Sequence, residues 1–211
     1  KSVNPAEGTT VVAQMPQAQI VKSDKAGWYR ITLDGNCTVE AADEDGAYYA
    51  KVTLDNLKRN AGGNELPNMV IEDWPDLAYR GFMLDISRNF TTKDNILKFI
   101  DLLGHYKVSV FHLHFGDDEG WRLEIGKFPE LTSYGAYHAF PEKNAEGEYV
   151  ETKALMPSYD GSIDPKDMSS SANGHLTKED YIEIIRHAWK HRIQVIPEFD
   201  TPGHSRAAIK A

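Results

Sequence analysis

The sequence predicts an α/β protein in two parts, a small α+β domain over residues 1–75 and a parallel β/α sheet over residues 76–211. Three observations predict this organisation. After residue 79, strand-like and helix-like segments alternate, which is the order of a parallel α/β sheet. The strand-like segments are nearly continuous apolar runs, typical of strands covered on both faces. Charged residues gather where each of these runs ends, and sheets of this kind bind ligands at that end.

In the first part, residues 1–20 show no clear period, and we expect them to form a loose lead-in. The next two β-branched runs, W-Y-R-I-T-L-D and C-T-V-E-A-A, meet at Asp34-Gly35 and predict a hairpin. A helix packed behind this hairpin is predicted by apolar residues at helical spacing: Ala47, Ala50, Leu54 and Leu57. The glycines of residues 61–64 end that helix, and residues 68–73 form a short strand before a linker.

The second part begins with an apolar strand, Y-R-G-F-M-L-D-I-S-R, over residues 79–88. Thr91 can cap the helix that follows, with Asp94 at the third position. The apolar face of this helix is predicted to contain Ile96, Ile100 and Leu103. A second buried strand, K-V-S-V-F-H-L-H-F, covers residues 107–115.

After a long polar loop, Thr177 and Asp180 repeat the capping pattern. The apolar stripe of this second helix is predicted to contain Tyr181, Ile184, Ile185, Ala188 and Trp189. The third strand, I-Q-V-I-P-E-F-D, covers residues 193–200.

Charged side chains follow all three strands at their C-terminal ends, and the residues concerned are Asp85, Arg88, Asp117, Asp118, Glu198, Asp200 and His204. A TIM barrel has its active site at this end of its strands, and so does a doubly wound sheet. The pattern therefore predicts where the site lies but does not choose between the two folds.

Several of these residues can do chemistry. Asp117 and Asp118 are adjacent carboxylates just past a strand, and adjacent carboxylates repel one another unless something uses them. His204 follows Thr201-Pro202-Gly203, and this tight turn is predicted to bring the histidine back over the strand end, where it can relay charge between acids. Glu198 shares a strand face with Asp200, so this charged pair must be partnered or functional.

His112 and His114 share one face of the second strand. The structural interpretation is that each is a hydrogen-bonded packing residue. The alternative is a metal site, since His-x-His at a barrel strand end can hold zinc. The G-D-D-E-G-W continuation favours recognition of sugar hydroxyls instead, and we expect no metal and no cofactor. Arg80 opens the first strand, where an arginine is commonly a surface ion pair.

Composition limits the partners. The formal net charge is −9 and no basic stripe occurs, which argues against nucleic acid and anionic membranes as partners. Cys37 is the only cysteine, so an intramolecular disulfide and a thiolate zinc cluster are excluded. No apolar run approaches the roughly 20 residues that span a bilayer.

Three ordered motifs resemble the first barrel strands of glycoside hydrolase family 20, the β-N-acetylhexosaminidases: Y-R-G-F-M-L-D-I-S-R-N-F, F-H-L-H-F-G-D-D-E-G-W-R-L-E-I and V-I-P-E-F-D-T-P-G-H-S-R-A. The preceding section is similar to the small α+β domain that precedes that barrel. The resemblance implies the first three strands of a TIM (β/α)8 barrel. It also implies retaining hydrolysis of terminal N-acetylhexosamine residues from glycans, in which the 2-acetamido oxygen of the substrate attacks the anomeric carbon.

The resemblance also implies roles for single residues. Asp117 is similar to the aspartate that pairs with a histidine, here His204, to tune the general acid. Arg80 is similar to the arginine that binds hydroxyls of the sugar. Asp118, Trp121 and Glu198 lie in matched motifs and are expected to support substrate binding.

One part of the family pattern is missing from the sequence. No H-x-G-G-D-E-like stretch carries the catalytic Asp-Glu pair, and residues 80–211 are about half of a whole barrel's ~250 residues. We therefore expect a truncated chain whose active site is completed by the remainder of the polypeptide, and we expect this chain alone to be inactive. From the glycan substrates of the family we expect a periplasmic or secreted protein. The alternatives are a metal-dependent hydrolase using His112 and His114, and a non-catalytic sugar-binding module.

Overall fold

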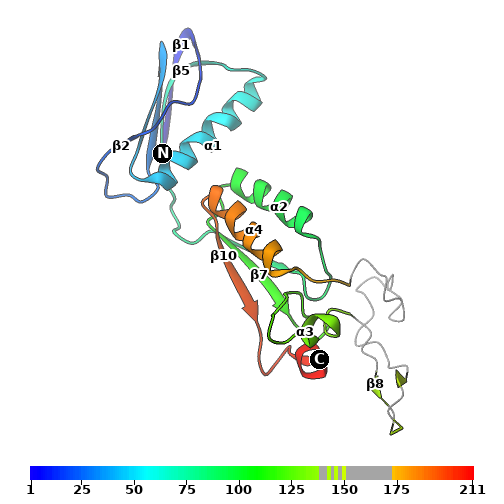
Figure 1. Cartoon of the computed structure of the whole chain (residues 1–211). Helices are drawn as coiled ribbons and strands as arrows, with labels where there is room; N and C mark the ends of the chain where they lie inside the picture. The colour runs from blue at the N-terminus through cyan, green and yellow to red at the C-terminus, as the bar shows by residue number, and fades with distance from the viewer. Residues whose placement is uncertain (138–141, 144, 147–148, 151–172) are drawn as a thin grey trace. The chain divides into compact units, whose positions relative to one another are not determined.

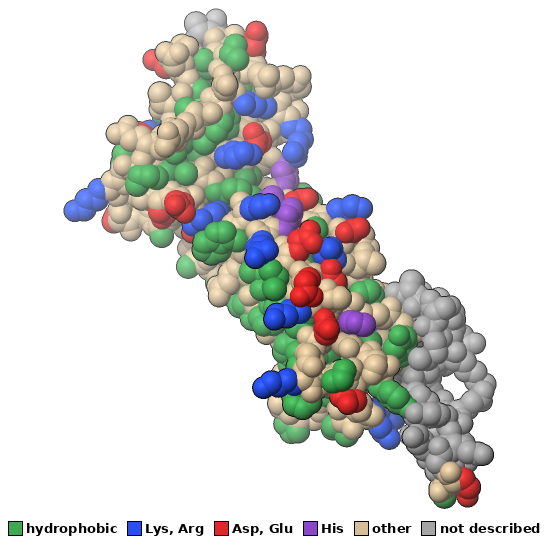
Figure 2. Space-filling view, in the orientation of Figure 1, with side chains coloured by type: hydrophobic (Ala, Val, Ile, Leu, Met, Phe, Trp, Pro, Cys, Tyr) green, Lys and Arg blue, Asp and Glu red, His purple; other side chains and the backbone are tan. Residues whose placement is uncertain are grey.

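The computed structural model describes residues 1–137, 142–143, 145–146, 149–150 and 173–211 (Figure 1). Two compact units are present. The first comprises Lys1–Arg80 together with Gly104–Ser109, and the second comprises Gly81–Leu103 together with Val110–Ala211. Among the described residues, no helix combines the length and the apolar character that crossing a membrane requires. On the face that Figure 2 shows, acidic and basic side chains are mixed rather than separated into areas of one sign.

The first unit contains a five-stranded sheet covered by one helix. In spatial order its strands are β1 (Ser2–Val12), β5 (Glu65–Asp73), β3 (Tyr29–Asp34), β4 (Asn36–Ala41) and β2 (Gln19–Ile20). All neighbours are antiparallel except β2 and β4. Helix α1 (Glu44–Ala61) buries Tyr49, Ala50 and Leu54 against the inner faces of β3 and β4, which supply Ile31, Leu33 and Val39. This is the helix that was predicted to pack behind the hairpin.

In this unit the turn and capping residues lie where the sequence predicted a hairpin and the end of a helix. Strands β3 and β4 pair up to Asp34 opposite Asn36, and Gly35 between them has φ = 65°, a conformation that glycine adopts without steric cost. Helix α1 begins after Asp43, whose side chain accepts a hydrogen bond from the Gly46 amide, and ends at Gly62, whose φ is 71°. The predicted hairpin and helix end are therefore confirmed.

The expectation of a loose lead-in is wrong for residues 2–12. These residues form β1, which pairs with β5 from Ser2 opposite Glu72 to Val12 opposite Glu65. The register shifts between Pro5 and Thr10. Strand β1 forms by pairing with β5, which is more than 50 residues away in the sequence. It therefore does not require alternating apolar and polar residues within its own segment.

The second unit contains a parallel three-stranded sheet in the order β10 (Gln194–Phe199), β7 (Val110–Gly116), β6 (Gly81–Asp85). Helices α2 (Lys93–His105) and α4 (Lys178–Lys190) connect the strands (Figure 1). The shorter elements are α3 (Glu130–Ser133), α5 (Arg206–Lys210) and the hairpin of β8 (Glu142–Lys143) and β9 (Tyr149–Val150). The central strand β7 buries Phe111, Leu113 and Phe115 completely, as expected for a strand covered on both faces.

The caps and apolar faces of the two long helices differ from the prediction in detail. Before α2, the hydroxyl of Thr92 rather than Thr91 accepts from the Asn95 amide at 3.4 Å. Before α4, Thr177 and Asp180 form the predicted reciprocal capping box. The predicted face of α2 is buried, because Ile96, Ile100 and Leu103 are at most 5% exposed.

Only part of the apolar stripe predicted for α4 is buried in the described part of the chain. Ile184 and Ala188 are fully buried, whereas Ile185 is 41% exposed and Trp189 is 66% exposed. Trp189 instead carries the guanidinium of Arg192 over its ring, 5.1 Å from the centroid. Helical spacing therefore identified the correct side of α4 but not its width.

Candidate active site

The ends of the three parallel strands meet in one row. Asp85 of β6 and Glu198 of β10 both lie opposite His114 of the central strand β7. Because side chains at matched positions of parallel strands point to the same face, the two acids flank one histidine at the carboxyl edge of the sheet. The strand-end gathering that the sequence predicted is therefore formed.

A tight turn after β7 positions the first aspartate. Gly116 bridges to Trp121, and the Asp117 amide donates to the Gly120 carbonyl at 3.1 Å, so the chain reverses within residues 117–120. A Cβ on Gly116 would lie only 3.1 Å from the Trp121 ring, which explains the glycine. The turn points the Asp117 side chain inward, and this residue is 2% exposed.

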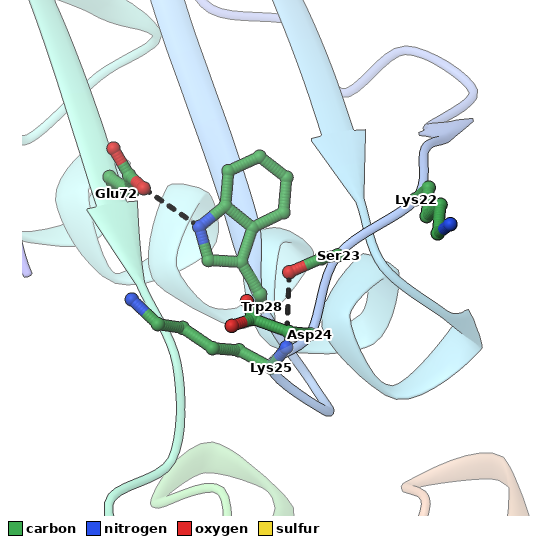
Figure 3. A pocket seen from close by; sticks show the side chains of 6 residues that line it. All are labelled: Lys22, Ser23, Asp24, Lys25, Trp28 and Glu72. Carbon is green, nitrogen blue, oxygen red and sulfur yellow. Dashed lines mark hydrogen bonds between the residues drawn. The ribbon is translucent and has the colours of Figure 1, made fainter.

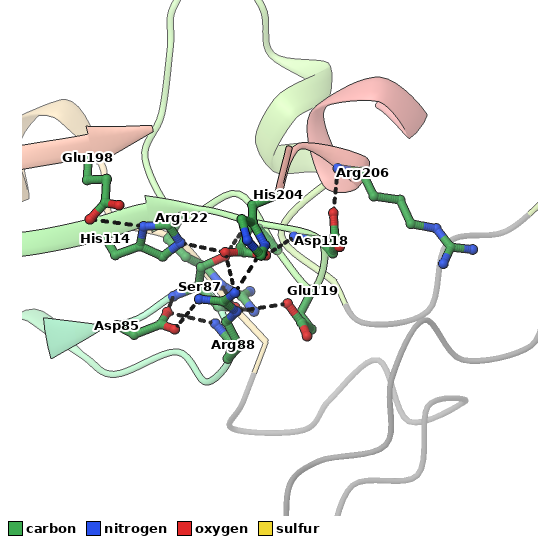
Figure 4. A network of polar contacts seen from close by, with 12 residues as sticks. Asp85, Ser87, Arg88, His114, Asp118, Glu119, Arg122, Glu198, His204 and Arg206 are labelled. Atoms are coloured by element: carbon green, nitrogen blue, oxygen red, sulfur yellow. Dashed lines mark hydrogen bonds and ion pairs between the residues drawn. The ribbon is translucent and has the colours of Figure 1, made fainter. Parts of the chain in front are cut away.

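The buried Asp117 carboxylate contacts three of the side chains labelled in Figure 4, His114, Arg88 and His204. Its Oδ2 lies 2.7 Å from His114 Nε2 and 2.7 Å from Arg88 Nη2. Its Oδ1 accepts from the Asp118 amide at 2.6 Å and lies 3.1 Å from His204 Nδ1. A buried carboxylate needs such partners, since an unpartnered charge in this place would be strongly destabilising.

His204 reaches this carboxylate from the loop after β10. The loop contains a cis Thr201–Pro202 peptide, and His204 itself has φ = 53°. Its Nδ1 lies between Asp117 Oδ1 and Arg88 Nη2, at 3.1 Å and 3.3 Å, and its side chain is 56% exposed. Within the described part of the chain, no hydrogen bond to its Nε2 is found, so this atom can accept a proton from the solvent side.

Arg88 joins three of the acids of the site, although the sequence analysis assigned it no role. It pairs with Asp85 and Asp117 at 2.7 Å each and with Glu119 at 3.3 Å. Burial alone would lower the pKa of Arg88, but these three carboxylates outweigh it and raise the pKa above its ordinary value. Arg88 is among the charged residues that the sequence analysis placed at the strand ends, and this position is the signal of its role.

Arg80 does not reach this group. It precedes β6, whose five residues separate it from the carboxyl edge by about 16 Å. Its guanidinium donates to the carbonyls of Lys107 at 2.9 Å and Leu77 at 2.7 Å and to the Tyr49 hydroxyl at 2.7 Å, all within the first unit. The geometry gives Arg80 a structural role rather than the expected contact with substrate hydroxyls.

Glu198 is shared by the two histidines of β7. Its Oε2 lies 2.6 Å from His112 Nε2 and 3.3 Å from His114 Nδ1. His114, 2% exposed, therefore has Glu198 on one ring nitrogen and Asp117 on the other. Ligand atoms of His114, Glu198 and Asp200 also lie within 4.8 Å of one another, a spacing that a metal ion could use.

The two remaining predicted residues have structural partners. Asp118 Oδ1 accepts from the Arg206 amide at 3.0 Å, at the start of α5. Trp121 stacks on Phe199 with ring centroids 4.8 Å apart, and its indole N–H donates to the Leu123 carbonyl at 2.6 Å. Phe199 in turn stacks on Phe115, so the three stacked rings of Trp121, Phe199 and Phe115 join the end of β7 to the end of β10.

Arg122 is a second arginine without an assigned role, and it is completely buried. Its guanidinium donates to three backbone carbonyls, to Ser87 at 2.7 Å and 3.1 Å, to Ala136 at 2.6 Å and to Gly174 at 3.1 Å. Burial lowers the pKa of Arg122 to about 10, partly offset by Asp85 and Glu119. These bonds join the loop after β6 to two distant loops and thereby hold Arg88 and Asp117 in place.

The first unit has a separate hollow beside Trp28, which Figure 3 shows. Trp28 donates its indole N–H to Glu72 at 2.9 Å, and the residue is only 8% exposed. The Lys25 ammonium lies 3.4 Å from the centroid of the neighbouring Trp74 ring. Since Trp28 presents so little aromatic surface, this hollow offers no stacking platform for a sugar.

A cluster of carboxylates and histidines at the carboxyl ends of parallel β/α strands is typical of the catalytic face of a barrel enzyme. Comparison with known families agrees with this class. Residues 77–211 match the glycosyl hydrolase family 20 catalytic domain, and residues 1–74 match domain 2 of the same family. The chain belongs to glycoside hydrolase family 20, and its fold is an α+β domain followed by part of a TIM barrel.

Two curated relatives and one solved structure illustrate the similarity. The N,N'-diacetylchitobiase of Vibrio harveyi is 40% identical over 186 residues, which are 88% of this chain and 20% of the relative. A beta-hexosaminidase of Vibrio vulnificus is 35% identical over 208 residues, 97% of this chain and 23% of the relative.

The solved structure is a GH20 exo beta-N-acetylglucosaminidase from Vibrio harveyi in complex with N-acetylglucosamine. It aligns with a TM-score of 0.71 at 32% identity and covers 92% of this chain and 28% of its own. The chain thus spans about a fifth to a quarter of the length of these curated relatives.

Proposed function

We propose that this chain is part of a β-N-acetylhexosaminidase that removes terminal N-acetylhexosamine residues from glycans with retention of configuration. In this proposal β6, β7 and β10 are the first three strands of a (β/α)8 barrel. The 2-acetamido group of the substrate is the nucleophile, and the catalytic Asp-Glu pair comes from outside this chain. Family membership and the hexosaminidase names of the relatives support the proposal.

The contact between Asp117 and His204 carries the proposal. The Asp117 carboxylate lies nearer to His204 Nδ1, at 3.1 Å, than the Arg88 guanidinium does, at 3.3 Å, and it favours the tautomer of His204 that has its proton on Nδ1. The lone pair of Nε2 then faces the open side of the site, where it can accept a hydrogen bond from a carboxylic acid. A general acid needs such a partner, because it must hold a proton before bond cleavage and regain it afterwards.

We further propose that Arg88, rather than Arg80, is the arginine near the substrate. Its side chain is 41% exposed at the carboxyl edge of the sheet, and Asp85, Asp117 and Glu119 hold its guanidinium in one orientation. A planar fork of donors fixed in this way suits the adjacent hydroxyls of a sugar. Asp117 and His204 act on the general acid, and Glu198 positions His112 and His114.

The test compares this chain with the product of the same gene read beyond Ala211. The 211-residue chain should not hydrolyse a chromogenic N-acetylglucosaminide, and the longer product should. Turnover by the pure short chain would show that the catalytic acid lies within it. An in-frame stop directly after Ala211 would refute the proposal that this chain is part of an active enzyme.

The cluster of His114, Glu198 and Asp200 supports a second candidate, a metal-dependent hydrolase. Exhaustive chelation separates the two functions. Loss of activity of the longer protein on chelation, restored by zinc, would favour the metal enzyme. Unchanged activity would favour the substrate-assisted glycosidase.

A further inference from the structure

Three metal-ligating side chains converge on the outer surface of the second unit. Asp101 belongs to α2, His187 belongs to α4, and His191 directly follows α4 as its C-cap. The Nε2 atoms of His187 and His191 lie 2.7 Å and 2.9 Å from the same oxygen, Asp101 Oδ1. One ligand atom from each of the three residues lies within 4.8 Å of the other two.

The spacing of the histidines produces this convergence. Residues four apart lie on the same side of a helix, so the two imidazoles project together toward α2, with ring centroids 5.1 Å apart. A tetrahedral zinc with bonds of about 2.0–2.1 Å holds its ligand atoms about 3.3 Å apart. Moving the carboxylate outward by about half an ångström would bring both nitrogen–oxygen separations to this value.

The surroundings of the cluster favour a cation and supply the missing ligands. The side chains of His187 and His191 are 26% and 24% exposed and that of Asp101 is 56% exposed, so water can complete the coordination shell. The cluster lies at the C-terminal turn of α4 and near that of α2, the helix ends at which the helix dipole carries partial negative charge. Lys190 shares the last turn of α4 and offsets part of this potential.

The cluster is distinct from the site at the strand ends. In a β/α unit each helix runs back toward the amino ends of the strands, so the C-terminal turns of α2 and α4 lie at the opposite edge of the sheet from the C-terminal ends of β7 and β10 (Figure 1). The proposed glycosidase chemistry uses none of the three residues. Their contacts on a solvent-exposed surface add little stability without an ion, because exposed ion pairs are screened by water and salt.

We propose that Asp101, His187 and His191 form a binding site for a divalent transition metal ion, with zinc as the expected occupant. Two imidazoles and one carboxylate suit zinc, nickel or copper, whereas magnesium and calcium prefer oxygen ligands. In the bound state both histidines are neutral, with the proton on Nδ1 and the Nε2 lone pair on the ion. The ion joins α2 to α4 and leaves at least one position to water, a structural clamp on the helix layer.

Calorimetric titration of the 211-residue chain with zinc chloride, in a buffer that does not bind metals, tests the site. We expect saturable binding that weakens by about tenfold or more in His187→Ala, because one of three protein ligands is lost. Asp101→Asn, a nearly isosteric change at an exposed position, should also weaken it. The matched control is His175→Ala, which removes an exposed histidine outside the cluster and should leave the affinity unchanged.

A structural readout separates this site from zinc held at the strand ends. Zinc should slow amide exchange in the last turn of α4 in the wild-type chain and in His175→Ala, and should lose this effect in His187→Ala. The absence of saturable zinc binding would overturn the proposal. So would binding that is equally strong in His187→Ala and Asp101→Asn. Neither result would bear on the glycosidase proposal, which uses no residue of this cluster.

Discussion

Nδ1 of His204 lies 3.1 Å from Oδ1 of Asp117, and the aspartate side chain is only 1% exposed. The two residues are 87 positions apart in the sequence and meet because the ends of neighbouring parallel strands β7 and β10 meet. The same carboxylate is also held by His114 and Arg88. Its charge therefore orients His204, and a change that removes the charge should act on proton transfer more than on folding.

In the longer hexosaminidase proposed above, Asp117→Asn should lower kcat by at least about 10-fold. This effect is smaller than the ~10²–10⁴-fold contribution of a general acid itself. Asparagine is nearly isosteric, but it removes the negative charge that holds the proton of His204 on Nδ1. The acidic and basic limbs of the pH–rate profile should shift as well. Asp118→Asn is the matched control, because its side-chain oxygen can still accept from the Arg206 amide. An unchanged pH–rate profile in Asp117→Asn would count against the relay.

Gly120→Ala should destabilise the second unit by about 1–3 kcal/mol. A Cβ at this position would lie 2.3 Å from Cζ of Arg122, and this buried guanidinium cannot move away without losing its bonds to three backbone carbonyls. Gly126→Ala is the matched control, because a Cβ there meets no atom within 4 Å. Urea unfolding of the three chains measures the difference. Equal urea midpoints for Gly120→Ala and Gly126→Ala would show that the Arg122 side chain can move aside at little cost in stability.

The capping box of α4 should make the stability of the second unit sensitive to acid. Burial alone would raise the pKa of Asp180, but hydrogen bonds from Lys93 and Thr177 outweigh it and lower the pKa below its ordinary value. A carboxyl whose pKa is lower in the folded state stabilises the fold above its unfolded pKa. This contribution is lost as the pH falls through the folded pKa.

Thr177→Ala should therefore cost about 1 kcal/mol at neutral pH. Asp180→Asn should remove part of the loss of stability between neutral and acidic pH, and urea unfolding at a series of pH values measures both effects. Glu179→Gln is the control, since this neighbour in the first turn of α4 is exposed and makes no contact in the capping box. If Asp180→Asn kept the full acid dependence of the wild-type chain, other carboxyls would be responsible for it.

Elements with a local signal could be predicted from the sequence. The hairpin depends on Gly35, the end of α1 on Gly62 and the start of α4 on Thr177, and each acts through its own backbone or its nearest neighbours. Strand β1 could not be predicted in this way, because its residues become a strand by pairing with β5. The exposure of Trp189 could not be predicted either, since helical spacing gives the direction of a side chain but not what covers it.

For the site, the sequence by itself determined which strand ends carry acids and histidines, because β/α order places the carboxyl ends of parallel strands at one edge. Only the tertiary structure decided how the side chains pair there. It joined Asp117 to His204, paired Arg88 with the acids at the carboxyl edge, and engaged Arg80, for which contact with sugar hydroxyls was expected, with backbone carbonyls of the first unit. The physical reason is that a charged group is positioned by whichever opposite charge or carbonyl lies near it in space. That choice depends on strand register and loop geometry, which no local spacing encodes.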